Sequence, residues 1–140
     1  MLGQLFIYTG IQGVNKLKLI NILQAREAIK NHLQDKISYK AAYKFACFMK
    51  ATETQRTFYD EQIKALVELC GKKNDKGEFI YERNSVVLDK EHISDWSTKT
   101  KELNETEVDT PAIVFMPEDF DEIKVSTEEM IALSEFIKEG

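Results

Sequence analysis

The chain contains 140 residues, the length of one domain, and 43% of them are hydrophobic, which is enough to build a core. Its net charge of −5 argues against strong nonspecific binding to nucleic acids. No stretch reaches the roughly 18 apolar residues that a membrane-spanning helix needs.

The first residues are apolar but carry no targeting signal that we can identify. Residues 1–15 are expected to be an N-terminal extension or to form a short strand from Leu5 to Thr9, which the following glycines would end. The segment lacks a basic N-terminal region, so we do not interpret it as a signal peptide. Residues 16–140 are expected to form a single, mainly helical domain.

Two helices are predicted in the first half of the chain. The first runs from Asn21, whose side chain can cap it, to about Gln34. The second is one long helix over residues 38–70, which begins at a Ser38 cap and ends at Gly71, because a glycine can adopt a left-handed cap without steric cost. A stripe on one face alternates steps of three and four residues, as in helices that pack along their length. The stripe consists of Ala42, Phe45, Met49, Thr52, Arg56, Tyr59, Ile63, Leu66 and Cys70.

A hairpin and a returning helix are predicted after the long helix. Residues 79–81 and 86–88 are short β-prone runs, and residues 75–77 before them form a turn signal. A helix from Asp89 to about Glu107 repeats the three-four spacing, so it is the natural antiparallel partner of the long helix. Polar residues interrupt the long stripe, which fits a hairpin within one chain better than a two-chain coiled coil, and the oligomeric state stays open. The apolar positions of the returning helix are Ile93, Trp96 and Leu103, with Thr100 between them.

The C-terminal part is predicted to contain one extended segment and one helix. Residues 111–116 are apolar and bracketed by prolines, which favours an edge strand. Ser126 and Glu129 have the spacing of a capping box, which predicts a helix start. The chain as a whole predicts a mainly α fold with a small β component, in which a long helix–β-hairpin–helix arm packs with a short N-terminal and a C-terminal helix. The apolar face of the last helix consists of Met130, Ile131, Leu133, Phe136 and Ile137.

The residue types that perform catalysis or bind metals are scattered along the chain. His32 and His92 have no second ligand at metal-binding spacing, and Cys47 and Cys70 are expected to be free thiols in apolar surroundings. We find no phosphate-binding glycine loop and no supported nucleophile–histidine arrangement. The sequence therefore predicts no catalytic, metal or cofactor-binding residue, and we expect a protein that is not an enzyme.

Two groups of side chains are candidate contacts for a protein partner. Aromatic residues crowd two turns of the long helix on more than one face, so they belong either to the core or to a contact surface. The candidates among them are Tyr39, Tyr43 and Phe48. The second group lies in residues 101–140, which contain 3 Lys/Arg and 12 Asp/Glu, and is either a solvated loop or a surface aimed at a basic partner. It consists of Glu118, Asp119, Asp121 and Glu122.

One basic group is a weaker candidate for contact with nucleic acid. Its residues lie close in sequence to Phe79 and Tyr81, and single strands are bound by basic grooves with stacking rings. Plain surface charge is the simpler interpretation, because the overall balance of the chain is acidic. The group consists of Lys72, Lys73, Lys76 and Arg83.

Three stretches of the chain carry a resemblance to known proteins: Tyr39-Lys40-Ala41-Ala42-Tyr43-Lys44, the close of the long helix with Gly71-Lys72 and Asp75-Lys76-Gly77, and the ending from Val125 to Ile137. Together they resemble a family of small phage and prophage proteins of Gram-positive bacteria that is classified as a domain of unknown function. The resemblance covers about residues 16–138 and implies a viral origin and a setting in the bacterial host cytoplasm or the virion. It implies no reaction and no binding residues.

We therefore expect a non-enzymatic, phage-encoded protein that works by protein–protein contact, such as a virion or tail-assembly accessory. The alternative is a phage inhibitor of a host defence system, for example a CRISPR nuclease, that acts through its acidic C-terminal surface. A nucleic-acid binder is the third hypothesis, and no membrane association is expected.

Overall fold

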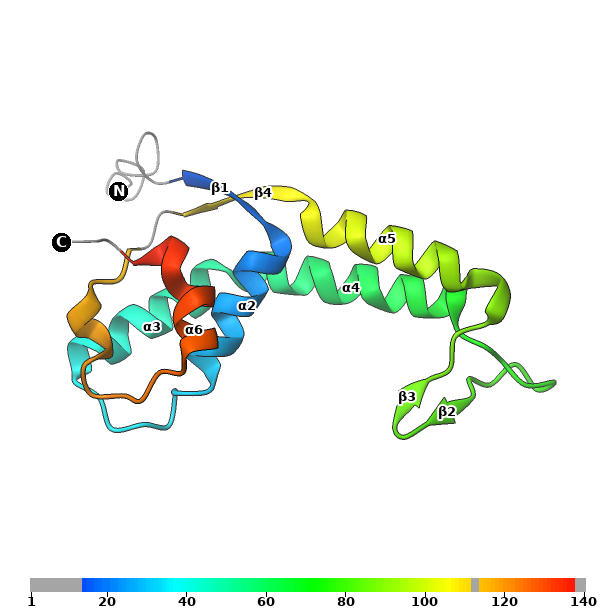
Figure 1. The fold of residues 1–140 in the computed structure, drawn as a ribbon, viewed down its shortest axis with the longest axis horizontal. Coiled ribbons are helices and arrows are strands. Elements are labelled where there is room, and N and C mark those ends of the chain that lie inside the picture. Colours follow the sequence, from blue (N-terminus) through cyan, green and yellow to red (C-terminus); the bar gives the residue numbers. More distant parts are fainter. Residues whose placement is uncertain (1–13, 112–113, 138–140) are drawn as a thin grey trace. The chain divides into compact units, whose positions relative to one another are not determined.

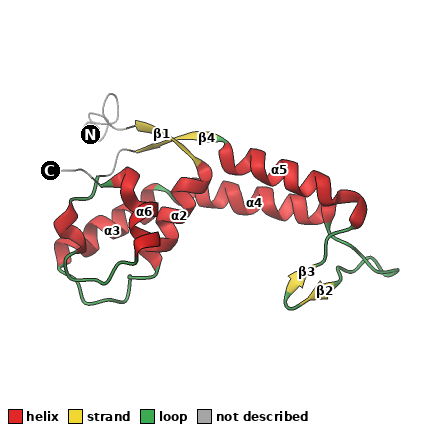
Figure 2. Ribbon diagram, in the orientation of Figure 1, coloured by secondary structure: helices red, strands yellow, loops and turns green. Residues whose placement is uncertain are grey.

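A computed structural model describes residues 14–111 and 114–137 of the chain. The chain divides into two compact units: unit 1 contains the residues up to Gln55 and those from Glu107 onwards, and unit 2 contains Arg56–Thr106. Most of the described residues are helical and the strands are short (Figures 1 and 2), which confirms the predicted mainly α fold with a small β component. The strand predicted over Leu5–Thr9 lies outside the described residues.

Unit 1 is built from short helices and one antiparallel pair of strands. In chain order its elements are β1 (Val14–Lys18), α2 (Leu19–Lys30), α3 (Tyr39–Ala51), the start of α4 (Glu53–Cys70), β4 (Glu107–Pro111), the 3₁₀ turn η2 (Pro117–Phe120), α6 (Thr127–Leu133) and the 3₁₀ turn η3 (Ser134–Phe136). Strand β1 pairs with β4, and α6 packs against α2.

The β1–β4 pair was not predicted from the sequence. Its register places Leu17 opposite Val108, and both side chains are half-buried against the core of unit 1. Helix α2 follows directly and begins at Leu19, so the predicted start at a capping Asn21 is wrong. The residue that precedes the helix, Lys18, is the last residue of β1 and makes no side-chain cap.

The predicted long helix is divided at Thr52. Its φ and ψ angles of −106° and 7° separate α3 from α4, so the prediction of one uninterrupted helix is wrong at this point. The reason is the buried guanidinium of Arg26 on α2, which donates to the Met49 carbonyl at 2.7 Å and to the Thr52 hydroxyl at 2.6 Å. The Thr52 hydroxyl in turn donates to the Phe48 carbonyl, which a threonine inside a helix does at the expense of regular geometry.

A cluster of phenylalanine rings forms the centre of the core of unit 1. Phe115 packs edge-on against Phe45 and Phe120, with ring centroids 5.5 Å apart in each pair, and its backbone N–H donates to the Phe136 carbonyl. Such edge-to-face contacts add to the stability that burial of the rings provides. In the predicted segment 111–116, Pro111 belongs to β4 and Phe115 forms a single bridge with Ile137, whereas residues 112 and 113 lie outside the described residues.

Unit 2 contains the rest of α4, a β-hairpin and α5 (Ile93–Glu105), which the 3₁₀ turn η1 (Lys90–His92) precedes. The two helices run side by side and antiparallel (Figure 1). The Asp89 N–H donates to the Cys70 carbonyl at one end, and the Tyr59 hydroxyl donates to Asn104 at the other, at 2.7 Å. This confirms the predicted returning helix.

The hairpin has shorter strands and a tighter turn than predicted. Strands β2 (Tyr81–Glu82) and β3 (Ser85–Val86) are joined by Arg83 and Asn84, which both have positive φ angles of 50° and 68°. A two-residue turn of this kind matches the twist of the strands, and asparagine tolerates the left-handed conformation better than most residues. The β-prone runs 79–81 and 86–88 predicted a four-residue loop over residues 82–85, whereas Glu82 and Ser85 belong to the strands.

Gly71 ends α4 as predicted, but for a different reason. Its φ angle is not in the left-handed region, and a Cβ atom there would lie 2.7 Å from the Val67 carbonyl oxygen and 2.9 Å from the Phe79 ring. The close approach of Phe79, and not a left-handed cap, therefore requires glycine at this position.

Replacing Gly71 with alanine should destabilise unit 2 by about 2 kcal/mol, because the new methyl group would have to displace a backbone carbonyl or the Phe79 ring. Urea unfolding followed by the fluorescence of Trp96, the single tryptophan of the chain, measures this directly. The control is Lys72→Ala, which removes only an exposed side chain. Equal stabilities of the two variants would contradict the steric explanation.

Candidate functional site

Helix α3 presents two tyrosines to solvent. The Ser38 hydroxyl caps the helix by accepting from the Ala41 N–H at 3.2 Å, which fixes the rotation of the first turn. One face of α3 is buried through Ala41, Phe45 and Phe48, whereas Tyr39 and Tyr43, one turn apart, are 94% and 72% exposed. The prediction of Phe48 as a partner contact is therefore wrong, since it is only 1% exposed and packs against Phe115 and Phe136.

The predicted acidic cluster lies on and just after η2, next to the start of α3. Two of its four carboxylates have internal roles. Asp119 is buried and accepts from Lys44 at 2.9 Å and from the Met116 N–H at 2.8 Å, and Glu122 accepts from the Ser38 N–H at 2.9 Å. Burial alone would raise the pKa of Asp119, but the bonds from Lys44 and the Met116 N–H outweigh it and hold that pKa below its usual value. Glu118 and Asp121 are exposed.

The structure thus brings together two groups that the sequence placed far apart. The Lys44–Asp119 ion pair and the Ser38–Glu122 hydrogen bond attach η2 and the residues just after it to the first turns of α3, the helix that carries the exposed tyrosines. We call this region the α3–η2 surface. It consists of Tyr39, Tyr43, Glu118, Asp121 and Glu122.

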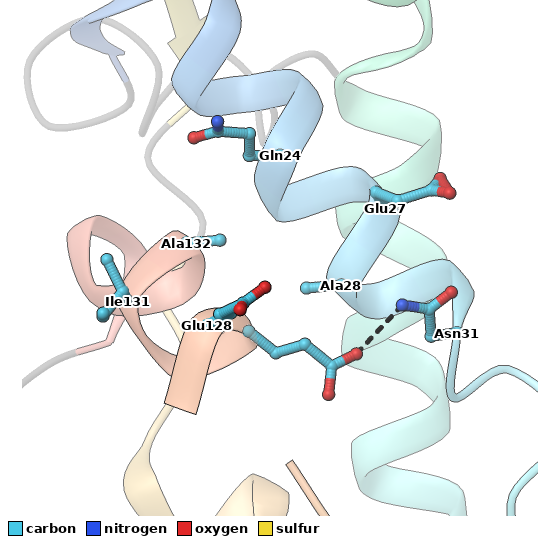
Figure 3. Close-up of a pocket in the computed structure, with 8 residues that line it drawn as sticks. Gln24, Glu27, Ala28, Asn31, Glu128, Ile131 and Ala132 are labelled. Carbon is cyan, nitrogen blue, oxygen red and sulfur yellow. Dashed lines mark hydrogen bonds between the residues drawn. The ribbon is translucent and has the colours of Figure 1, made fainter. Parts of the chain in front are cut away.

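A second feature of unit 1 is a groove of about 440 Å³ between α2 and α6. Ala28 and Ala132 face each other across it, and the Glu128 carboxylate is directed towards α2 (Figure 3). None of the residues that line it is a serine, threonine, cysteine, lysine or histidine. The lining consists of Gln24, Glu27, Ala28, Asn31, Glu128, Glu129, Ile131 and Ala132.

Two residues that line this groove, Asn31 and Glu129, belong to a hydrogen-bonded clamp between the end of α2 and the start of α6. Glu129 completes the predicted capping box with Ser126 and also accepts from Asn31 at 3.0 Å and from His32 at 3.0 Å. The other His32 nitrogen lies 2.6 Å from Asp35. Sequence reasoning treated His32 as an isolated surface residue, because nothing local connects it with a residue so far along the chain.

The clamp shifts the pKa values of both of its charged partners. The Ser126 N–H, His32 and Asn31 together lower the pKa of Glu129 to about 2. Burial alone would lower the pKa of His32, but its bonds to Glu129 and Asp35 outweigh burial and raise it above 6.5. Glu129 is therefore a fixed anion near neutral pH and has no capacity to act as a general acid.

The predicted basic group lies on the exposed surface of unit 2. Lys73 pairs with Glu68 at 3.3 Å and lies 5.0 Å from the centre of the Phe79 ring. Four carboxylates lie within the same stretch of residues 71–89 and match its four cations in number. This balance weakens the hypothesis of a nucleic-acid contact, because binding to phosphates requires an excess of positive charge.

The described residues, 14–111 and 114–137, contain neither a metal-binding cluster nor a membrane-spanning helix. Within those residues, no three His, Cys, Asp or Glu side chains are placed to hold a metal ion. No helix there combines the length and apolar character needed to span a bilayer. Cys47 and Cys70 are free thiols, and burial is the main cause that raises the pKa of the Cys70 thiol.

No protein-family model, no curated protein and no solved structure matches this chain.

Proposed function

We propose that this protein acts without catalysis, by holding a partner protein on the α3–η2 surface. The observation that supports this is the exposure of Tyr39 and Tyr43 on a helix whose opposite face is anchored in a phenylalanine core. Large aromatic rings on a rigid element lose little conformational entropy on binding, and tyrosine is among the residues that contribute most binding energy at interfaces.

The resemblance to phage and prophage proteins supplies the setting of the proposal. In that setting the partner is a component of the virion, and the protein is a virion or tail-assembly accessory in the host cytoplasm or the particle. Purified particles should then contain the protein. Its abundance in infected cytosol and absence from particles would contradict this version.

A second candidate function is inhibition of a host defence nuclease. The exposed carboxylates Glu118 and Asp121 support it, since they could occupy a basic channel. The acidic surface is smaller than the sequence indicated, because Asp119 and Glu122 serve internal contacts. The fair test is therefore the double variant Glu118→Gln with Asp121→Asn, which leaves the attachment of η2 intact. Full inhibition by that variant would reject the mimicry hypothesis.

The variant Tyr39→Ala with Tyr43→Ala should weaken partner binding at least about 30-fold, the effect of losing an aromatic hot spot worth about 2 kcal/mol. The partner is first identified by placing a photo-crosslinking residue at position 39 and analysing the adduct by mass spectrometry. Binding of the purified partner is then measured by calorimetry.

The matched control is Tyr81→Ala, which removes a tyrosine that is 61% exposed in unit 2. Its affinity should equal that of the unmodified protein. Circular dichroism should show the same helix content in all three proteins, because the exposed tyrosine rings are not part of the core. Equal affinities of the Tyr39–Tyr43 variant and the control would contradict the proposal.

A further inference from the structure

We infer that the groove between α2 and α6 is a second docking site, which takes an arginine or lysine side chain from a basic segment of a protein partner. The groove is separate from the α3–η2 surface, and the inference stands without the proposed function.

The shape of the groove fits a long, unbranched side chain. Its volume of about 440 Å³ is in the range of ligand-binding pockets. Ala28 and Ala132 have the smallest side chains that a helix offers with high propensity, and they leave the floor between α2 and α6 open (Figure 3). Ile131 is 68% exposed and lines the same groove, so apolar surface is available to an incoming methylene stem.

The groove is negatively charged, so it favours a positively charged occupant. Three of its lining residues are glutamates, and none is a lysine, arginine or histidine. Both oxygens of Glu129 already accept hydrogen bonds within the clamp, so this residue supplies a fixed negative charge. The acceptor for an incoming cation is Glu128, whose carboxylate is directed towards α2 (Figure 3). A cationic head group near Glu128 would be attracted without displacing any bond of the clamp.

Arginine and lysine combine both properties in one side chain. They bury an aliphatic stem against apolar surface and keep a charged head among polar groups. The alanines of the groove can contact such an aliphatic stem, and its glutamates can attract the charged head group. An acidic or purely apolar segment would leave these carboxylates facing like charge or removed from water without a partner.

The test uses the full chain, labelled with ¹⁵N, and a short alanine-based peptide that is capped at both ends and carries one arginine. Titration should shift the amide signals of residues 24–31 and 128–132 with a dissociation constant of about 1 mM, as expected for one anchored side chain. The same peptide with citrulline in place of arginine keeps the shape without the charge and should bind at least about 10-fold more weakly.

Three variants distinguish binding in the groove from nonspecific attraction to the acidic surface of the protein. Glu128→Gln should weaken peptide binding about 5-fold or more, whereas Glu118→Gln, which removes the same charge from η2, should leave it unchanged. Ala132→Leu should block binding by filling the floor, and unchanged amide signals elsewhere in unit 1 will show that this variant is folded. Absence of shifts in the groove, or equal weakening by Glu118→Gln, would overturn the inference. If spermine produced the same shifts with equal affinity, docking of a protein segment would be overturned in favour of a small polyamine.

Discussion

Replacing Phe48 with alanine should strongly destabilise unit 1 and should not act as a local change in a binding surface. The ring is 1% exposed and lies 4.9 Å from the centre of the Phe136 ring and 5.5 Å from that of Phe115. Truncation of a fully buried phenylalanine removes its burial energy and leaves a cavity, at a total cost of about 4 kcal/mol. That is a large share of the roughly 5–15 kcal/mol that stabilises an ordinary domain.

The measurement is urea unfolding followed by circular dichroism, together with hydrogen exchange of the α2 and α3 amides. The control is Phe58→Ala, the same substitution at a ring on α4 that is 43% exposed, and it should cost no more than about 1 kcal/mol. A cost for Phe48→Ala as small as that of the control would mean that Phe48 is not part of the core. Its role as a partner contact would then have to be considered again.

Elements with a strong local signal could be predicted from the sequence alone. The capping box of Ser126 and Glu129 and the cap at Ser38 use only neighbouring residues, and both are present with bonds of 3.0 to 3.2 Å. The spacing of Ile93, Trp96 and Leu103 likewise predicted a returning helix, because helical periodicity is a property of consecutive residues.

Features that depend on distant residues could not be predicted. The β1–β4 pair joins Leu17 to Val108, and neither strand has a strong β pattern. The break at Thr52 requires the guanidinium of Arg26, which lies on another helix. Local propensity favours a continuous helix at that point, and only the tertiary contact interrupts it.

The candidate surface was predicted in parts but not as a whole. Tyr43 and Phe48 both lie in an aromatic-rich helix, and only the packed core decides which ring is exposed. The placement of η2 at the start of α3 depends on the bond between Ser38 and Glu122, two residues that lie 84 positions apart in the sequence. Individual residue types therefore pointed to possible contacts, whereas the fold determined which of them share one surface.

The clamp between α2 and α6 should make the stability of unit 1 depend on pH in two directions. The pKa of Glu129 falls from 4.5 to about 2 on folding, so its contribution is complete above about pH 4.5 and is lost as the pH falls towards 2. The pKa of His32 rises above 6.5 on folding, so its contribution is complete below that value and is lost as the pH rises through the raised pKa. Stability should therefore be greatest between about pH 4.5 and pH 6.5.

The variant Glu129→Gln should remove up to about 3 kcal/mol at pH 6, the free energy that corresponds to the full shift of its pKa. Urea unfolding of the two proteins from about pH 3 to pH 9 gives the comparison. The loss of stability below pH 4.5 should become smaller in this variant without disappearing, because Asp119 also has a lowered pKa. His32→Asn should instead remove the loss at high pH.

The control is Glu128→Gln. This variant removes a negative charge next to Glu129, and Glu128 itself takes no part in the capping box. If it matched Glu129→Gln in stability and in pH dependence, nonspecific charge would explain both results. We expect the two variants to differ, because only Glu129 makes capping bonds. These bonds fix its carboxylate at the start of α6, and His32 connects that carboxylate to the end of α2. Protonation of Glu129 or deprotonation of His32 then weakens the packing of two helices at once.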